Sequence, residues 1–171
     1  MEIKLKSRKG GKRALTPEQR KLLVDFSKWI SAKLFPRIDD KVSVTVVLDK
    51  TLYSSNKTYG TSVWEDVHRK GREFTVELDT SFNFLTVILT LAHELVHVKQ
   101  WATGEWYQLF RESYVDAYSF NGEIVDAAYT NYWDLPWEVE AHGRSIGLVA
   151  QWIKHRSLEK EEWTKIKLPI T

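Results

Sequence analysis

The segment from about Ser81 to Ala102 carries apolar residues on almost every side of the helix that its spacing predicts. Gly104 follows the last turn and is expected to end the helix. A helix that is apolar nearly all round has to be buried, so we expect the fold to pack around this segment. Ten apolar residues carry this pattern: Phe84, Leu85, Val87, Ile88, Leu89, Leu91, Ala92, Leu95, Val96 and Val98.

One polar stripe runs along this otherwise apolar helix. At 100° per residue its five side chains fall within about 80° of arc. They are Thr86, Thr90, His93, His97 and Gln100. Polar groups on a buried helix cost free energy unless something meets them, so the stripe indicates a functional site.

The stripe contains the sequence His93-Glu94-Leu95-Val96-His97. Two histidines four residues apart project from the same helix face, so both imidazoles can reach one metal ion. Glu94 lies about 100° further round, close enough to contact a metal-bound water without binding the metal. The alternative, two histidines hydrogen-bonded within the core, explains neither this glutamate nor the buried setting.

The chain contains no cysteine among its 171 residues, and five histidines. A tightly bound metal must therefore use histidine, aspartate or glutamate. Structural zinc sites are usually rich in thiolates, whereas a nitrogen-and-oxygen set with an open position suits catalysis. The composition favours a catalytic metal over a structural one.

Catalytic zinc usually has a third protein ligand, and no histidine follows His97 at short spacing. The segment after Pro136 predicts a last long helix reaching about His155. On that helix Glu140 shares the polar face with Arg144, which indicates an ordinary ion pair. Glu138 lies on the apolar side, where a carboxylate needs a charged partner such as zinc. We therefore favour Glu138 over Glu140, with His142 as a supporting group or alternative ligand.

These residues resemble the gluzincin-type zinc metallopeptidases, in which HExxH on one helix is joined by a glutamate on a later helix. Glu138-Val139-Glu140-Ala141 is similar to the ExxA signature, whose first glutamate binds zinc in that family, and the short chain resembles its compact single-domain members, the minigluzincins. The resemblance covers residues 72–155 and departs from the family where His142 replaces a frequent aspartate. It implies a zincin-like fold, with a strand over Arg72–Asp79 bordering the cleft.

The resemblance implies that His93, His97 and Glu138 hold Zn²⁺ and that a metal-activated water attacks a peptide or protein substrate. Glu94 would be the catalytic general base that takes the proton of this water. A substrate strand could pair with Phe74–Leu78. The candidates for a second donor to the reacting oxygen are Tyr114, Tyr118, Tyr129, Tyr132 and His142.

The remaining pattern predicts an α+β protein with a small antiparallel or mixed sheet packed on the motif helix and with further helices. A capping box at Thr16-Pro17-Glu18-Gln19 begins a helix that Pro36 ends, and alternation predicts strands at Val42–Asp49, Arg72–Asp79 and, more weakly, Ser62–Val67. The aromatic-rich residues 105–134 are expected to be helical, with a break at Asn121-Gly122.

Residues 1–13 are rich in basic side chains and are expected to form a flexible tail before a single domain over 14–171. A weak nucleic-acid contact through this tail would support one alternative, a metal-bound but non-proteolytic zincin-scaffold protein that acts on a protein or nucleic-acid partner. A second alternative is a DNA-associated protease similar to the SprT-like proteins, which share HExxH but use a third histidine that is not found here at short spacing. The basic residues are Lys4, Lys6, Arg8, Lys9, Lys12 and Arg13. The net charge of +2 is too small to indicate nucleic-acid binding by the whole chain.

No secretory signal or membrane span is visible, which predicts a cytoplasmic protein without a membrane partner.

Overall fold

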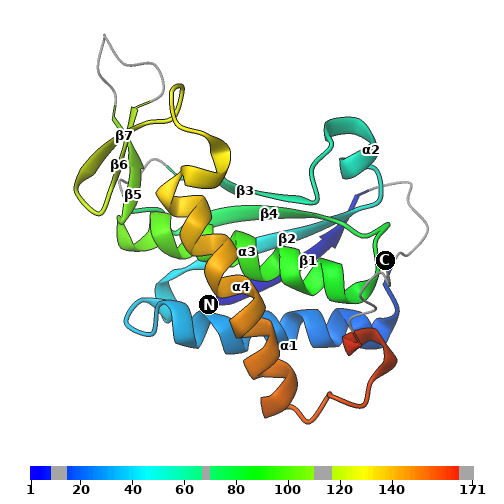
Figure 1. Ribbon diagram of the computed structural model, residues 1–171. Coiled ribbons are helices and arrows are strands. Elements are labelled where there is room, and N and C mark those ends of the chain that lie inside the picture. Colours follow the sequence, from blue (N-terminus) through cyan, green and yellow to red (C-terminus); the bar gives the residue numbers. More distant parts are fainter. Residues whose placement is uncertain (9–14, 67–69, 110–116, 166–171) are drawn as a thin grey trace.

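A mixed four-stranded sheet with helices packed on one face organises the molecule (Figure 1). The computed structural model describes residues 1–8, 15–66, 70–109 and 117–165. The sheet contains β1 (Glu2–Ser7), β2 (Ser43–Asp49), β3 (Gly60–Trp64) and β4 (Glu73–Asp79). Their order is β1-β2-β4-β3, in which β1, β2 and β4 are parallel and β3 is antiparallel to β4.

Four helices and a second sheet complete the described part of the chain. The helices are α1 (Pro17–Leu34), α2 (Leu52–Asn56), α3 (Phe84–Thr103) and α4 (Pro136–His155), with 3₁₀ turns η1 (Asp39–Lys41), η2 (Tyr132–Asp134) and η3 (Glu162–Thr164). The second sheet contains β5 (Trp106–Gln108), β6 (Ala117–Phe120) and β7 (Glu123–Asp126), all antiparallel. This arrangement confirms the expected α+β class and the mixed sheet.

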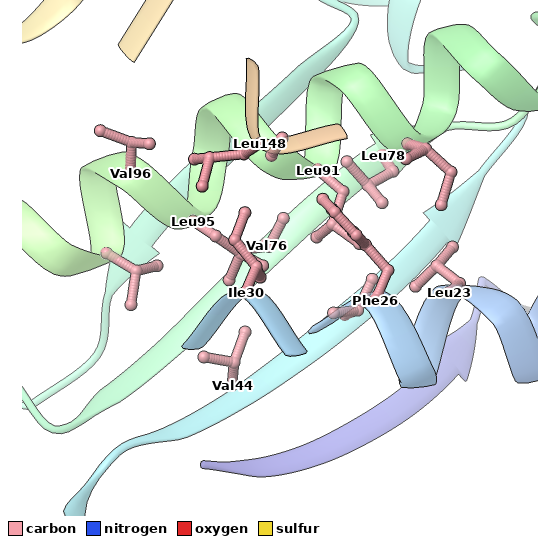
Figure 2. Close-up of a cluster of buried hydrophobic side chains, with 14 of the residues drawn as sticks. Leu23, Phe26, Ile30, Val44, Val76, Leu78, Leu91, Leu95, Val96 and Leu148 are labelled. Atoms are coloured by element: carbon pink, nitrogen blue, oxygen red, sulfur yellow. The ribbon is translucent and has the colours of Figure 1, made fainter. Parts of the chain in front are cut away.

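The main core lies between the sheet and helices α1 and α3 (Figure 2). Period-2 alternation puts every second side chain of β2 and β4 on the same face. The parallel register then sets these buried residues side by side in three pairs: Val44 with Phe74, Val46 with Val76, and Leu48 with Leu78. Apolar residues of α1 and α3 cover them, among them Phe26, Ile30, Leu91 and Leu95.

Helix α1 begins and ends where the sequence predicted. The Thr16 side chain accepts a hydrogen bond from the backbone N–H of Gln19, and Gln19 Oε1 accepts one from the Thr16 N–H. This reciprocal capping box satisfies two amide groups that the first turn would otherwise leave unpaired. The helix ends at Leu34, two residues before Pro36.

Helix α3 is the central buried helix that the apolar pattern predicted. Asn83 caps its first turn by accepting from the backbone N–H of Thr86, and Gly104 ends it in the left-handed conformation, with φ of 77°. Helix α4 crosses α3, and the second sheet lies beyond the C-terminal end of α3 (Figure 1). Helices α3 and α4, from distant parts of the sequence, therefore meet at the polar stripe of α3.

The expectation of a flexible basic tail is wrong for residues 2–7. These residues form β1, which pairs in parallel register with β2 from Glu2–Ser43 to Ser7–Leu48. Ile3 and Leu5 pack against the core, whereas Lys4 and Lys6, which alternate with them, are exposed, and this alternation is the pattern of an edge strand. Residues 9–13 lie outside the described residues.

The expectation of helix over residues 105–134 is also wrong, because β5, β6 and β7 occupy much of this segment. Asn121 and Gly122, expected as a helix break, form the two-residue turn between β6 and β7, with φ of 51° and 89°. Positive φ at both central residues is the geometry of a tight hairpin, which asparagine and glycine favour.

Strand β4 matches the expected strand but does not border the cleft. It lies inside the sheet between β2 and β3, so β3 is the strand that ends the sheet next to α3. Gly60 permits this close approach, because a Cβ there would lie 2.5 Å from Thr90 Cγ2 of α3. None of the helices in the described ranges is long and apolar enough to cross a membrane.

Candidate metal centre

Helices α3 and α4 bring three candidate ligands together. Nε2 of His93 and Nε2 of His97 lie 3.0 Å apart on one face of α3. Glu138, in the first turn of α4, reaches both: Oε2 lies 3.3 Å from Nε2 of His93, and Oε1 lies 3.5 Å from Nε2 of His97. The structure therefore places the three sequence-predicted ligands at one point.

The spacing of these atoms fits a small tetrahedral ion. Zinc bonds of about 2.0–2.2 Å at tetrahedral angles place ligand atoms about 3.3–3.6 Å apart. The distances from Nε2 of His93 to Oε2 (3.3 Å) and from Nε2 of His97 to Oε1 (3.5 Å) match this value, each to a different oxygen of Glu138, and the two nitrogens lie slightly closer together, at 3.0 Å. Two imidazole nitrogens and one carboxylate also form a donor set that zinc accepts and that leaves a position open.

A second set of potential ligands shares two of these residues. His93, Glu138 and His142 present ligand atoms that all lie within 4.8 Å of one another, a group that could hold a metal ion. Nε2 of His142 is 3.9 Å from Glu138 Oε2, and its side chain is 42% exposed, against 7% for His97. His97 therefore offers the shorter distances and the more buried imidazole, whereas His142 lies on the outer side of the group.

Glu138 is a buried carboxylate with several donors around it. Tyr132 Oη donates a hydrogen bond to Oε2 of Glu138 at 2.8 Å. The Glu138 side chain is only 11% exposed. Burial alone would raise the pKa of this carboxyl group, but the close contacts with His93 and His97 outweigh burial and hold the pKa far below its usual range. An ionised carboxylate on the apolar side of a helix is what the sequence led us to expect.

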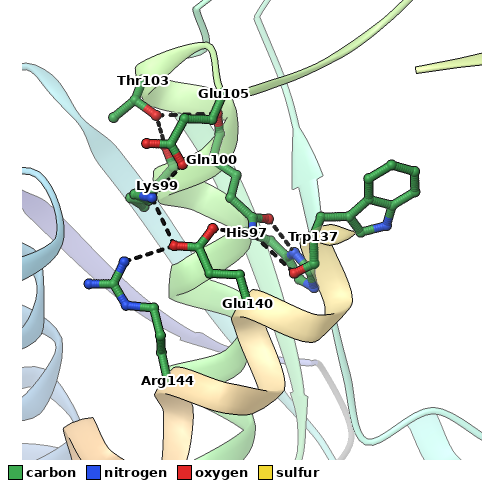
Figure 3. A network of polar contacts seen from close by, with 8 residues as sticks. All are labelled: His97, Lys99, Gln100, Thr103, Glu105, Trp137, Glu140 and Arg144. Atoms are coloured by element: carbon green, nitrogen blue, oxygen red, sulfur yellow. Dashed lines mark hydrogen bonds and ion pairs between the residues drawn. The ribbon is translucent and has the colours of Figure 1, made fainter. Parts of the chain in front are cut away.

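Glu140 faces a different set of groups, as Figure 3 shows. It forms the expected ion pair with Arg144 at 2.8 Å, and it also reaches α3, where Lys99 Nζ lies 2.9 Å from Oε1. Burial opposes ionisation, but hydrogen bonds from Gln100, Lys99 and Arg144 lower the pKa of Glu140 to about 2. Its carboxylate is therefore fully engaged away from the histidines.

Glu94 lies beside the histidines but is deeply buried, with 6% of its surface exposed. Burial raises the pKa of its carboxyl group, and the nearby His97 and His93 oppose that rise only in part. Glu94 lines two cavities that also share His93 in their walls. A carboxylate at this position can contact a molecule in either cavity.

The larger cavity, of about 680 Å³, has a mainly hydrophobic and aromatic wall beside His93 and His142. Its apolar lining includes Leu89 of α3, Ile146 of α4 and the aromatic residues Tyr59 and Trp133. The smaller cavity, of about 430 Å³, is bordered by Gly60, Thr61 and Ser62 of the edge strand β3, together with the three candidate ligands. An extended chain lying along β3 would pass directly over the histidines.

The structure separates the candidates for a second donor to the reacting oxygen. Tyr132 and His142 lie at the site and contact each other, with 3.4 Å between Oη and Nε2. Tyr129 is 91% exposed, and Tyr118 packs against Trp106 and Trp137. Tyr114 lies outside the described residues.

Three tryptophans form one wall of the site; sequence reasoning predicted that they lie in the core or a cleft wall, but not that they stack on one another. Trp106 stacks between Trp101 and Trp137, with ring centroids 4.3 Å and 4.7 Å away, and it lies 5.5 Å from the ring of His97. The abundance of tryptophan predicts an aromatic core or cleft wall, but the pairing depends on β5 being a strand.

Comparison with protein-family models, with curated proteins and with solved structures gives no match.

Proposed function

We propose that this protein is a zinc-dependent metallopeptidase. The observation that carries the proposal is the meeting of Nε2 of His93, Nε2 of His97 and the Glu138 carboxylate at distances of 3.0 to 3.5 Å. Two of these groups come from HExxH on a buried helix, a motif whose mechanics are those of zinc-dependent peptide hydrolysis. The third comes from a helix 41 residues further along the chain, as in the gluzincins that the sequence resembles.

In this proposal His93, His97 and Glu138 hold the ion. Zn²⁺ bound there would polarise a peptide carbonyl and make water at the open position more acidic. Glu94 would accept the proton of the attacking water and return it to the leaving amine. Its position one residue after His93 places its carboxylate near the ligands, and its burial keeps bulk water from competing for that proton.

The shape of the site supports a peptide as the substrate. Strand β3 ends the sheet, so in the described residues its outer backbone groups have no neighbouring strand on that side. An extended peptide can pair with such an edge and gain main-chain hydrogen bonds. This corrects the expected docking strand from Phe74–Leu78 to Gly60–Trp64. The zincin-like character of the fold belongs to the same proposal.

We favour a peptidase over a non-proteolytic binding protein or a DNA-associated protease. The main support for the binding protein was a free basic N-terminus, and residues 2–7 are instead part of the sheet. A non-proteolytic protein also leaves unexplained why Glu94 is buried beside the candidate ligands, whereas a general base has to be there. The DNA-associated protease shares Glu94 but would need a third histidine, and none follows His97 at short spacing.

The deciding experiment compares the wild type with Glu94→Gln, Glu138→Gln and Glu140→Gln. Zinc content and cleavage of an unstructured peptide library are measured on each purified protein. We expect Glu94→Gln to keep zinc and lose cleavage, and Glu138→Gln to lose zinc affinity by far the most. Full zinc occupancy in Glu138→Gln would refute the ligand assignment, and a zinc-loaded wild type that cleaves nothing in the library would refute the peptidase.

A further inference from the structure

We propose that Gln100 is a positioning residue for His97 and that Glu140 sets the orientation of the Gln100 amide. This inference rests on the proposed zinc site and adds two residues to it. Gln100 is fully buried, three residues after His97 on α3, and Glu140 approaches it from α4. Figure 3 shows the resulting chain of contacts from Glu140 through Gln100 to His97.

The partners of Gln100 fix which end of its amide is the donor. Nε2 lies 3.0 Å from the backbone carbonyl oxygen of Trp137 and 3.0 Å from Glu140 Oε2. A carbonyl oxygen and an ionised carboxylate can only accept hydrogen bonds. The amide group that faces them must therefore be the NH₂, and both of its hydrogens are used.

The other end of the amide then determines the tautomer of His97. Gln100 Oε1 lies 2.8 Å from His97 Nδ1, and a carbonyl oxygen there needs a donor. His97 must carry its hydrogen on Nδ1, which leaves a lone pair on Nε2, the atom that faces His93 and Glu138. Hydrogen bonds of this kind orient metal-binding histidines and make the ligating nitrogen more basic.

Glu140 is itself held in place by two cations. Lys99 and Arg144 contact Oε1 at 2.9 Å and 2.8 Å, which leaves Oε2 for Gln100. Lys99 is held in turn by Glu105 on its other side. The ion pairs keep the carboxylate charged and fixed, so it cannot present a donor to Gln100.

The first test reads the tautomer of His97 directly. Long-range ¹⁵N–¹H NMR spectra of the metal-free full-length protein distinguish a ring protonated on Nδ1 from one protonated on Nε2. The chain has five histidines, and the spectrum of His97→Gln identifies the signal. We expect His97 to be protonated on Nδ1 in the wild type and to lose that preference in Gln100→Leu. A wild-type ring that carries a hydrogen on Nε2 and none on Nδ1 would overturn the proposal.

The second test measures zinc affinity by competition with a chelator. We expect Gln100→Leu to bind zinc about 10- to 100-fold more weakly than the wild type. Glu105→Gln is the matched control, because it removes a partner of Lys99 without touching Gln100, and it should change neither the affinity nor the His97 tautomer. Equal affinity and an equal tautomer in Gln100→Leu and wild type would refute a positioning role.

A double variant separates positioning from simple packing. In Gln100→Glu alone, two carboxylates face each other, so zinc affinity should fall. In Gln100→Glu combined with Glu140→Gln, the new carboxylate at position 100 accepts a hydrogen bond from His97 Nδ1. The new amide at position 140 donates a hydrogen bond to that carboxylate. We expect this swap to recover the Nδ1–H tautomer and much of the zinc affinity, although the Trp137 carbonyl loses its partner. A swap that stays as weak as the single variant would show that the two residues serve only to join α3 and α4.

The outcomes also separate this proposal from the proposed function. A wild type that binds no zinc would refute the metallopeptidase, but the tautomer of His97 in the metal-free protein would still report on Gln100. If Gln100→Leu does not fold, the same measurements are made on Glu140→Gln. Glu140 is less buried than Gln100, and its replacement changes only one of the two acceptors that face the Gln100 amide. We expect a smaller loss of zinc affinity there, and no loss would count against the chain of contacts.

Discussion

Tyr132 Oη donates a hydrogen bond of 2.8 Å to Glu138 Oε2, the same oxygen that lies 3.3 Å from Nε2 of His93. The 3₁₀ turn that carries Tyr132 leads directly into the first turn of α4, which carries Glu138. Tyr132, a near neighbour in the sequence, therefore orients the carboxylate of Glu138. Gln100, from the same helix as His97, orients the imidazole of His97.

Replacing Tyr132 by phenylalanine should weaken zinc binding, because Glu138 loses the donor that orients its carboxylate. We expect a loss of about 10-fold in affinity, at the lower end for groups that support a ligand. Chelator competition measures it, and Tyr129→Phe serves as the control because Tyr129 is exposed and makes no contact with Glu138. Identical affinities in the two variants would show that Glu138 needs no support from Tyr132.

Replacing His97 should cost far more zinc affinity than replacing His142. Nε2 of His97 lies closer to the other ligand atoms, and its imidazole is already oriented by Gln100. We expect His97→Ala to lose more than about 100-fold in affinity, the effect of removing a ligand rather than a supporting group, and His142→Ala to lose less than about 10-fold. The reverse order would make His93, Glu138 and His142 the metal-binding set instead.

Zinc should raise the thermal stability of the wild type and not that of Glu138→Gln. A ligand that binds only the folded protein stabilises it by about 2.7 kcal/mol at a free concentration 100-fold above its Kd. For a chain of this size each kcal/mol corresponds to about 2–4 °C in Tm. We therefore expect an increase of roughly 5–11 °C that a chelator reverses. Scanning fluorimetry with and without zinc measures it, and an equal increase in Glu138→Gln would indicate binding elsewhere.

The sequence predicted the elements whose signals are local. The capping box of α1, the all-apolar surface of α3 and the proline that opens α4 each lie within one or two turns, and all three helices are found. The placement of Glu138 on the apolar side of α4 is equally local, because a carboxylate there needs a partner wherever the helix packs. These signals were enough to predict that His93, His97 and Glu138 lie close together, as they do.

The errors concern features that depend on neighbours in space. Alternation shows that a strand has one buried face but not which strands lie beside it, so β4 was taken for the edge and β3 was not. Strands β5 to β7 have only three or four residues each, too few to establish a period. The contact between Glu140 and Gln100 depends on how α4 crosses α3, which no single helix encodes.

Acid should destabilise the wild type through Asp25, which lies in the middle of α1 and contacts the C-terminal end of α4. The Arg156 guanidinium contacts both oxygens of Asp25, at 2.8 Å and 2.9 Å, and Trp152 Nε1 donates to Oδ2 at 2.9 Å. Hydrogen bonds from Arg156, and then from Trp152, outweigh partial burial and lower the pKa of Asp25 from its ordinary value of 3.8. A group whose pKa is lower in the folded state stabilises it above the unfolded pKa and loses this contribution as the pH falls through the folded pKa.

The free energy of unfolding should therefore decrease from about pH 4 downward in the wild type, and less steeply in Asp25→Asn. Both side chains of the ion pair are about 40% exposed, so solvent screening keeps the difference small. Urea titrations at several pH values measure it, with Glu159→Gln, in an exposed turn, as the control. Parallel pH profiles for the wild type and Asp25→Asn would contradict the expectation.

Gly60 is a glycine beside the candidate site at which an added methyl group should harm the protein. Its Cβ would lie 2.5 Å from Thr90 Cγ2 and 3.1 Å from the backbone oxygen of Glu77, so β3 would have to move away from α3. We expect Gly60→Ala to lower the free energy of unfolding by about 1–3 kcal/mol, the usual cost of overpacking. Gly147 is the matched control: it lies within α4 with nothing within 4 Å of an added Cβ, so Gly147→Ala should stabilise the helix by up to about 1 kcal/mol.

Because Gly60 lines both cavities, Gly60→Ala should also reduce peptide cleavage while leaving zinc affinity unchanged. Chemical unfolding and chelator competition distinguish these effects, and a Gly60→Ala protein as stable and active as the wild type would show that β3 does not pack this closely over the site.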